Sequence, residues 1–496
     1  MTTVRSLAKD SAIYGGSTIL VKMMSWLMNM VFTRVLLPED YGVMTNLYAY
    51  LAVLAIILTF GMETGLFRFI SQKDKYKAEN VYSTVLTIVG IIVAAFMVIF
   101  LVFLDGIRPW LWEKDVPDNC IRLVIIILGI DAFSAIPFAY LRYKKRAVKF
   151  GFLKILNIIV YTVSCIFLMI ICPWIDKHNP GIISWFWKSD SMLIYVFIAN
   201  LAGTVVQTVF LLPELFGFRF SFDKTLARKM LSYCFPLVIM GLAGMSNQVV
   251  DKLIFPAVYQ GEDWKSELGI YSGCFKIALV MMIFTQAFRY AYEPFVFEKK
   301  SDRDSKQSYA DVMKYFIMFG LLVFLGVMFY IDIFKYFVGN NYWSALKVVP
   351  IVLMGELFFA VYFNLSIWYK LNDKTWWGTV FSIIGFAIVI TLNVVYIPKA
   401  GYIACAWASF AGNLLIMILS YFIGQKYYPV RYDLKSIGFY TVTALILYTI
   451  SCFMSPENIY LRLIINTILI AVYIFTVIKR DLPVNNIPFM KRLFNR

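Results

Sequence analysis

The chain has 496 residues, of which 61% are hydrophobic and 15% are charged, whereas about a quarter of an ordinary soluble domain is charged. A helix that crosses a bilayer needs about 20 predominantly apolar residues, so this composition leaves almost no sequence for a water-soluble domain. It excludes a secreted enzyme, a nucleic-acid-binding module and a disordered scaffold, and it predicts an all-α polytopic membrane protein. The net charge of +16 then needs an explanation other than a polyanionic partner.

The apolar runs, bounded by charged residues or by proline and glycine, predict fourteen membrane-spanning helices. In chain order they are residues 11–36, 44–70, 80–104, 118–141, 151–172, 191–215, 230–257, 269–297, 310–337, 344–369, 377–397, 401–425, 436–453 and 459–478. An even number of spans places both chain ends on the same side of the membrane.

The distribution of basic residues predicts the orientation of these helices. Lysine and arginine concentrate in alternate loops, among them the run from Arg142 to Lys154, and in the C-terminal tail. Such residues are retained on the cytoplasmic side of a membrane, so both termini are expected in the cytoplasm. Tryptophans of the opposite loops, such as Trp174 and Trp185, are typical of an aromatic belt. Topology thus explains the positive charge, and no nucleic-acid partner is expected.

The sequence lacks the motifs of soluble enzymes. It contains no phosphate-binding Walker loop and no His-Glu-x-x-His motif, and its single histidine is His178. One histidine cannot form a zinc site or a nucleophile–base pair with a second one. We therefore expect transport rather than catalysis, with no metal and no cofactor.

An internal repeat relates the two halves of the chain. Residues 29–38 have the pattern Asn, three residues, Thr-Arg, three residues, Pro. Residues 247–256 repeat this pattern with Asp-Lys in place of Thr-Arg. A glycine then opens the next span in each copy, Gly42 in the first and Gly269 in the second.

A second match, between residues 199–203 and 408–412, follows in the same order. Six helices per copy place the copies in the same orientation, related by an axis along the membrane normal. The predicted domains are an N-lobe of helices 1–6 (1–229), a C-lobe of helices 7–12 (230–433), and two accessory helices with a cytoplasmic tail (434–496).

Polar residues on one face of helices 1 and 7 predict a water-accessible cavity between the two lobes. Ionisable groups inside a membrane are costly and usually face a cavity or a partner. Lys22 and Asn29 lie on one face of helix 1, and Asn247 and Asp251 form the corresponding stripe in helix 7. The candidate substrate-binding or cavity-lining residues are Lys22, Asn29, Arg34, Arg68, Asn247, Lys252, Lys276 and Arg289.

Acids within the spans are candidates for ion coupling, and they are Glu63, Asp131, Asp251 and Glu356. An acid at this depth can carry a proton, although a neutral, hydrogen-bonded acid is equally consistent. Asp251 and Lys276 have similar expected depths and could pair, either as a structural ion pair or as part of a site. The mixture of bases and acids suits a passage for an anionic head group better than a pocket for hydrophobic cations.

Three segments resemble bacterial polysaccharide-unit flippases of the multidrug/oligosaccharidyl-lipid/polysaccharide exporter superfamily. They are Ser-Ala-Ile-Tyr-Gly-Gly from Ser11, Arg-Val-Leu-Leu-Pro-Glu-Asp-Tyr-Gly from Arg34, and the run from Asn393 to Ala408. The third segment has Ala404 where a second glycine is commoner in the family. The long outer loop from Pro173 to Asp190 is a further departure, because the second half has a tight turn there.

The resemblance implies transfer of undecaprenyl-diphosphate-linked oligosaccharides from the inner to the outer leaflet of the bacterial plasma membrane. Basic residues would meet the diphosphate while the polyprenyl tail stays among the membrane lipids. Alternating access would be coupled to H⁺ or Na⁺, and polysaccharide polymerases are possible partners. Two alternatives from the same superfamily stay open: a multidrug cation antiporter and a flippase of peptidoglycan lipid precursors.

Overall fold

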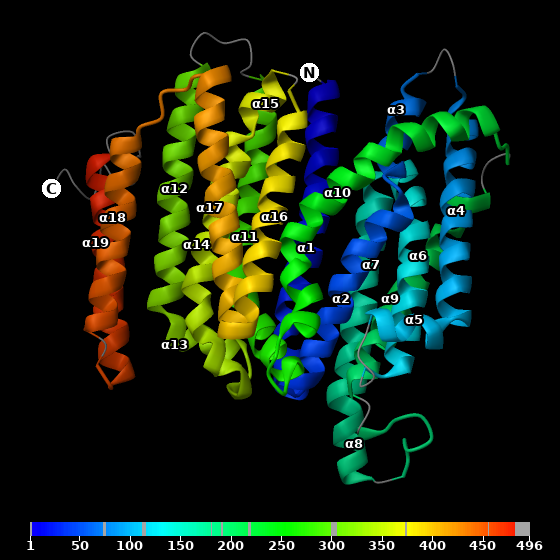
Figure 1. Ribbon diagram of the computed structural model, residues 1–496, viewed down its shortest axis with the longest axis horizontal. Helices are drawn as coiled ribbons and strands as arrows, with labels where there is room; N and C mark the ends of the chain where they lie inside the picture. Colours follow the sequence, from blue (N-terminus) through cyan, green and yellow to red (C-terminus); the bar gives the residue numbers. More distant parts are fainter. Residues whose placement is uncertain are drawn as a thin grey trace. The chain divides into compact units, whose positions relative to one another are not determined.

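The computed structural model consists of helices joined by short connections (Figure 1). It describes residues 2–72, 76–111, 116–179, 181–189, 192–216, 220–298, 305–372, 374–454 and 456–481. No β-strand occurs within these ranges, so the all-α prediction is confirmed. The predicted cytoplasmic tail beyond residue 481 lies outside them.

The first half of the chain contains α1 (Thr2–Val35), α2 (Pro38–Thr59), α3 (Met62–Ile70), α4 (Ala78–Val102), α5 (Leu104–Leu111), α6 (Asp118–Tyr143), α7 (Ala147–Ile166), the π-helical η1 (Phe167–Ile171), α8 (Cys172–His178), α9 (Met192–Phe216) and α10 (Lys224–Val258). The second half contains α11 (Trp264–Glu298), α12 (Ser305–Phe329), α13 (Ile331–Phe334), η4 (Lys335–Phe337), η5 (Asn340–Val348), α14 (Val349–Leu365), α15 (Ile367–Leu371), α16 (Trp376–Ala400), α17 (Tyr402–Tyr427), α18 (Leu434–Phe453) and α19 (Ile459–Arg480).

The described helices agree with a protein that crosses a membrane about fourteen times. Thirteen helical segments are long and apolar enough to span a bilayer. The 34-residue α1 is not among them, because polar residues such as Lys22 lower its hydropathy, but its length exceeds what a span needs. With α1 as the fourteenth, the predicted fold class is confirmed.

The predicted span 44–70 is interrupted by a break between α2 and α3. Phe60 and Gly61 both adopt left-handed backbone angles, with φ of 49° and 64°. This conformation ends α2 and starts α3 in a new direction, because two left-handed residues cannot continue a right-handed helix. The break places Glu63 in the first turn of α3.

The chain divides into two compact units, each of which is discontinuous in sequence. Unit 1 comprises Met1–Gly273 and Ser382–Cys405, and unit 2 comprises Cys274–Phe381 and Ala406–Arg496. These units do not test the predicted lobes 1–229 and 230–433, which stay a prediction.

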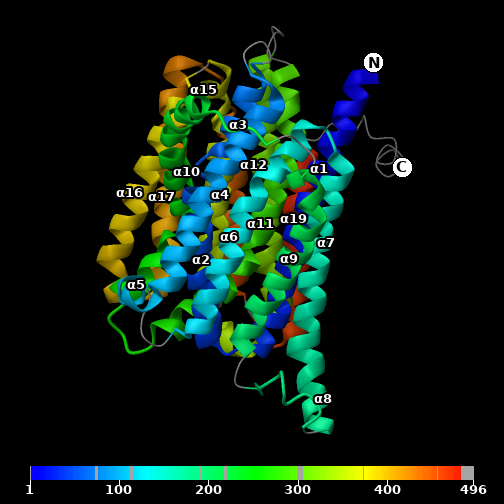
Figure 2. The same cartoon turned by 90° about the vertical axis from the view of Figure 1, so that its right-hand side faces the viewer.

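Unit 1 is built around helices α6, α7 and α9, which pack closely against one another. A Cβ atom on Gly203 of α9 would lie only 2.9 Å from the carbonyl oxygen of Asn157 on α7. In Figure 2, α7 continues through η1 into α8 as one long rod. Helix α10 contacts α3, α4 and α2 along its length. This packing places the N-terminal half of α7 beside α6, where several charged residues lie.

In unit 2, polar contacts attach the accessory helices α18 and α19 to α12 and α13 (Figure 1). Near one end of α19, Arg462 pairs with Asp332 at 2.8 Å. In the middle, the Tyr473 hydroxyl donates to the carbonyl of Met318 at 3.1 Å. At the other end, Lys314 pairs with Asp481 at 2.7 Å. The accessory pair is thus attached to α12 at two levels and to α13 at a third.

The carboxylate of Asp481 joins three helices just beyond the end of α19. Burial alone would raise its pKa, but hydrogen bonds from Lys314 and Tyr440 outweigh this effect. The pKa of Asp481 is therefore lower than its ordinary value. Nearby, the side chain of Asp433 accepts hydrogen bonds at the start of α18, and these lower the pKa of Asp433.

Candidate functional site

The N-terminal ends of α2 and α11 cross at the two glycines of the internal repeat, within unit 1. A Cβ atom on Gly42 would lie 1.9 Å from the carbonyl oxygen of Lys265, and one on Gly269 would lie 1.8 Å from that of Pro38. Each oxygen belongs to the residue one helical turn before the opposite glycine, so the contact is reciprocal. Only a residue without a side chain fits at either position. The two copies of the repeat therefore meet at equivalent positions.

One turn beyond Gly42, a side-chain hydrogen bond connects α2 to α10. The carbonyl of Lys252 would normally accept a bond from the amide four residues later, but that residue is Pro256, which has no N–H. The side-chain amide of Asn46 donates to this carbonyl instead, at 2.7 Å. The proline of the second repeat copy thereby creates the acceptor that holds α2 against α10.

The candidate residues Asp251 and Lys252 form a buried ion pair beside this crossing. Their side chains are 4% and 11% exposed, and the ammonium lies 2.8 Å and 3.0 Å from the two carboxylate oxygens. The hydroxyl of Tyr271 donates to the same carboxylate at 2.9 Å. Both residues are thus sealed in this conformation. The similar expected depths of Asp251 and Lys276 predicted a pair, whereas in the structure Lys252 and Tyr271 contact the Asp251 carboxylate.

Asn29 of the first repeat copy is also buried. It is 2% exposed, and its side-chain oxygen accepts a hydrogen bond from the Tyr41 hydroxyl. Its Nδ2 has no hydrogen-bond partner among the described residues, and neither amide atom of the fully buried Asn393 has one. Asn247, the counterpart of Asn29, lies in α10, but its side chain is outside the described part.

A second group of charges lies on α3, α6 and α7 of unit 1. The guanidinium of Arg142 forms an ion pair with Glu63. The carboxylate of Asp131 is exposed and accepts a hydrogen bond from Thr204 of α9 at 3.1 Å. Half-buried Lys154 lies within electrostatic range of Asp131, Glu63 and Arg142. The structure thus brings two predicted acids together with two cations.

Arg142 and Lys154 belong to a basic run that predicts a cytoplasmic loop, and neither is among the predicted site residues. In the structure, Arg142 belongs to the last turn of α6 and Lys154 to the third turn of α7. Lys154 extends over the ring of Phe138, with its ammonium 4.1 Å from the ring centroid. A lysine near a helix end can extend to the interface or turn inward, and hydropathy alone does not distinguish the two.

The other predicted cations of unit 1 are exposed. Lys22 lies on an open face of α1. Arg34 donates to the carbonyl of Met30 at 2.8 Å. The guanidinium of Arg68 lies 3.9 Å from the ring centroid of Tyr233. These three cations are accessible in this conformation, unlike Lys252.

In unit 2, the predicted residues Lys276, Arg289 and Glu356 are all half-buried. The guanidinium of Arg289 lies 3.4 Å from the ring centroid of Phe363, which is typical of a cation–π contact. Glu293, which could pair with Arg289 one turn away, has its side chain outside the described part.

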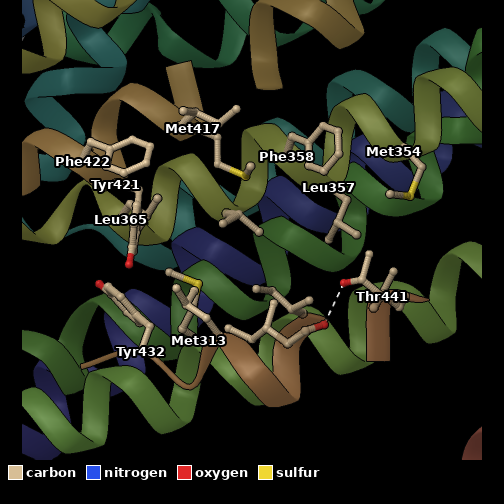
Figure 3. A pocket seen from close by; sticks show the side chains of 16 residues that line it. Met313, Met354, Leu357, Phe358, Leu365, Met417, Tyr421, Phe422, Tyr432 and Thr441 are labelled. Atoms are coloured by element: carbon tan, nitrogen blue, oxygen red, sulfur yellow. Dashed lines mark hydrogen bonds between the residues drawn. The ribbon is translucent and has the colours of Figure 1, made fainter. Parts of the chain in front are cut away.

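An apolar groove runs through unit 2 between α12, α14, α17 and the start of α18 (Figure 3). Its volume is about 290 Å³, and no charged side chain lines it. Met313, Met354 and Met417 contribute flexible thioether side chains to its walls. The Thr441 hydroxyl in its wall is engaged by the carbonyl of Ile437 at 2.8 Å. The lining suits a hydrocarbon chain. The groove is not among the features predicted from the sequence.

The described residues contain no candidate metal centre. No group of three or more His, Cys, Asp or Glu side chains that could hold a metal ion occurs among them. What the arrangement offers is charged groups within membrane-spanning helices and, separately, an apolar groove. These two features suit an amphiphilic molecule with a charged head and a long apolar tail.

Comparison with known proteins agrees with this chemistry. The family described as "Polysaccharide biosynthesis protein" matches residues 7–292, which is more than half of the chain. No curated protein is similar enough in sequence to count as a relative.

Several solved structures share the fold. A structure described as the lipid II flippase MurJ in an inward closed conformation has a TM-score of 0.72 and 14% identity, over 94% of this chain and 98% of that chain. An inward-facing multidrug resistance MATE transporter has a TM-score of 0.63 and 13% identity, over 84% and 94% of the two chains. A structure described as a MOP superfamily transporter from Pyrococcus furiosus has a TM-score of 0.58 and 12% identity, over 84% of this chain and 95% of that chain.

Proposed function

Because the chain belongs to the polysaccharide biosynthesis protein family, we propose that it is a flippase for lipid-linked oligosaccharides. Its substrate would be an undecaprenyl-diphosphate-linked glycan, which moves from the cytoplasmic to the outer leaflet of a bacterial plasma membrane. The observation that carries this proposal is the coexistence of membrane-embedded cations with an apolar groove in a single chain.

The exposed cations supply the electrostatic part of the proposed mechanism. A diphosphate carries negative charge that is costly to move through hydrocarbon, and nearby lysine and arginine side chains offset this cost. Lys22, Arg34 and Arg68 are accessible for such contacts. The apolar groove of unit 2 is by itself suited to a hydrocarbon chain, because no charged side chain lines it.

Alternating access requires one side of the substrate path to close while the other is open. The Gly42–Gly269 crossing, the Asn46 bond and the sealed Asp251–Lys252 pair support a closed state on one side. With both termini in the cytoplasm, as the basic loops predict, this closed side would face the cell exterior. Lys252 would then reach substrate only after the crossing opens.

A flippase of peptidoglycan lipid precursors is the second candidate, because its substrate has the same diphosphate and lipid chemistry. The shared fold with the structure described as a lipid II flippase favours it. A multidrug cation antiporter is less favoured, because the accessible charges of α1 and α3 that are candidates for binding are mainly cations.

Reconstitution into liposomes tests the proposal. A fluorescent undecaprenyl-diphosphate oligosaccharide, a fluorescent peptidoglycan precursor and a hydrophobic dye cation would be assayed in parallel, with protein-free liposomes as the control. We expect the oligosaccharide to become accessible to an added quencher faster with the protein than without it. Equal rates would contradict the proposal, and faster movement of the precursor or the dye would favour the corresponding alternative.

A further inference from the structure

We propose that the connection between α6 and α7 binds the phosphate group of an anionic bilayer phospholipid through Lys144, Arg146 and Lys149. These three residues are called the basic cluster. The occupant is a phospholipid that stays beside the protein, and not the transported molecule. The inference goes beyond the proposed function and does not depend on it, because binding of a bilayer lipid can be measured without any transport.

The three cations of the basic cluster surround a single carboxylate, that of Glu214 on α9. Arg146 and Lys149 lie 2.9 Å and 3.0 Å from one of its oxygens, and Lys144 lies 3.9 Å from the other. The Glu214 side chain is 4% exposed, whereas each of the three cations is 31% exposed or more. One cation is enough to balance the carboxylate, so two positive charges are in surplus and accessible.

The acids of adjoining segments do not remove this surplus. Glu63 of α3 pairs with Arg142. The Asp223 carboxylate accepts hydrogen bonds from two backbone amides at the start of α10. Glu79, in the first turn of α4, forms no ion pair with the basic cluster within the described part of the chain. Lys145, which is exposed in the same connection, adds a further positive charge.

The basic cluster lies where phospholipid head groups are expected. It spans the short connection and the first turn of α7, between two helical segments that are long and apolar enough to cross a bilayer. A connection between two spans lies at the membrane surface. No side chain caps the N-terminus of α7, so the backbone N–H groups of its first turn add a partial positive charge there. Side chains and backbone thus both attract an anion.

An exposed apolar stripe on α7 begins beside the basic cluster and gives the acyl chains a place. It consists of Val148, Phe152, Ile159 and Val163, which are all exposed. Their spacings of four, seven and four residues put them on one face of the helix. In a bilayer, acyl chains cover such a face. A phospholipid can therefore contact the cations with its phosphate and the stripe with its chains, whereas a free phosphate would use only the cations.

Native mass spectrometry of the full-length protein in mild detergent tests the site, with equal amounts of phosphatidylglycerol and phosphatidylcholine added. We expect the wild-type protein to retain the anionic lipid about tenfold more than the zwitterionic one. Lys144→Gln together with Arg146→Gln should abolish this preference, while Lys149 still balances the buried Glu214. Lys144→Arg together with Arg146→Lys keeps both charges and should keep the preference.

The matched control removes two exposed positive charges elsewhere in unit 1. Arg122→Gln together with Lys188→Gln should retain the wild-type preference for phosphatidylglycerol. If the control loses as much preference as the cluster variant, the attraction is general and the site is overturned. Equal retention of both lipids by the wild-type protein would overturn it as well. Should the double cluster variant fail to fold, the single change Arg146→Gln should still lower the preference about threefold.

A second arm of the experiment distinguishes a bilayer lipid from the proposed substrate. Undecaprenyl diphosphate is added in an amount equal to that of phosphatidylglycerol. We expect phosphatidylglycerol to stay bound to the wild-type protein. Displacement that requires Lys144 and Arg146 would show that the basic cluster binds the diphosphate instead, and would overturn the assignment. None of these results decides whether the protein transports lipid, which the liposome assay measures separately.

Discussion

Two acid–lysine couples of unit 1 have the same chemical groups but different surroundings. Asp251 and Lys252 are sequence neighbours, their side chains are nearly inaccessible, and Tyr271 completes the contacts of the carboxylate. Asp131 is exposed, and Lys154, which lies within electrostatic range of it, belongs to another helix, α7. The first couple has no exposed side through which an ion or a phosphate could approach in this conformation. Accessibility rather than residue type therefore distinguishes the two couples.

The largest expected effect comes from breaking the sealed couple. Asp251→Ala leaves the Lys252 ammonium buried without its carboxylate, which typically costs about 3–5 kcal/mol of stability. We expect this loss in the free energy of unfolding, measured by thermal denaturation in detergent. The double change Asp251→Ala with Lys252→Met should recover much of it, because it removes the unpaired charge. A single variant as stable as the wild type would contradict the sealed state.

A second, smaller effect should follow from a change at the helix crossing that leaves every charge in place. Gly269→Ala puts a methyl group against the Pro38 carbonyl, where the helices must move apart. Overpacking of this kind costs about 1–3 kcal/mol, measurable in the same assay. Gly326→Ala in α12 is the matched control, since its Cβ would meet nothing within 4 Å. If both variants lose equal stability, the crossing is not tightly packed.

Acid should weaken a third charged contact, which lies beyond the end of α19. The pKa of Asp481 is lower in the folded protein than its ordinary value of 3.8. The ionised Asp481 carboxylate therefore stabilises the folded protein fully at pH values above its unfolded pKa of 3.8. This stabilisation is lost as the pH falls through the lower pKa that Asp481 has in the folded protein. We expect the wild-type melting temperature to fall more than that of Asp481→Asn between about pH 5 and pH 3. Parallel curves for the two proteins would show that this carboxylate does not stabilise the attachment of α19.

The smallest effect on stability is expected at the open couple. Asp131→Asn keeps the size of the side chain and an acceptor for Thr204, and changes at exposed positions usually alter stability by about 0.5 kcal/mol or less. The melting temperature should therefore stay near that of the wild type. A stability loss as large as that of Asp251→Ala would place Asp131 among the structural acids.

The sequence predicted the features that depend on local composition. Apolar runs indicated the helices, and the matching patterns that begin at Asn29 and Asn247 led to the glycines that meet at the crossing. The sequence did not predict the break at Phe60 and Gly61, because hydropathy carries no information about the left-handed backbone angles of these two residues. The groove in unit 2 was also missed, since it needs side chains from four helices that are far apart in the chain.

The partners of the predicted acids were harder to anticipate than the acids themselves. Successive residues of a helix point about 100° apart, so Asp251 and Lys252 do not look like a pair in sequence. The long lysine side chain nevertheless reaches the carboxylate, with its ammonium 2.8 Å from an Asp251 oxygen. Lys154 was assigned to a loop because it follows a basic run, yet its side chain lies over Phe138. In both cases the long, flexible lysine side chain reaches a contact that the position of its Cα atom does not indicate.

The reciprocal crossing also constrains how the two copies of the repeat can diverge. Each glycine leaves room for a backbone carbonyl oxygen of the other copy. A side chain introduced at either glycine would therefore displace the backbone of the opposite helix. A mutation at either position is therefore felt by both copies, and no change in one side chain of the partner helix can compensate for it. Gly42 and Gly269 should consequently be retained or lost together during evolution, even where the rest of the two copies has become unrecognisable.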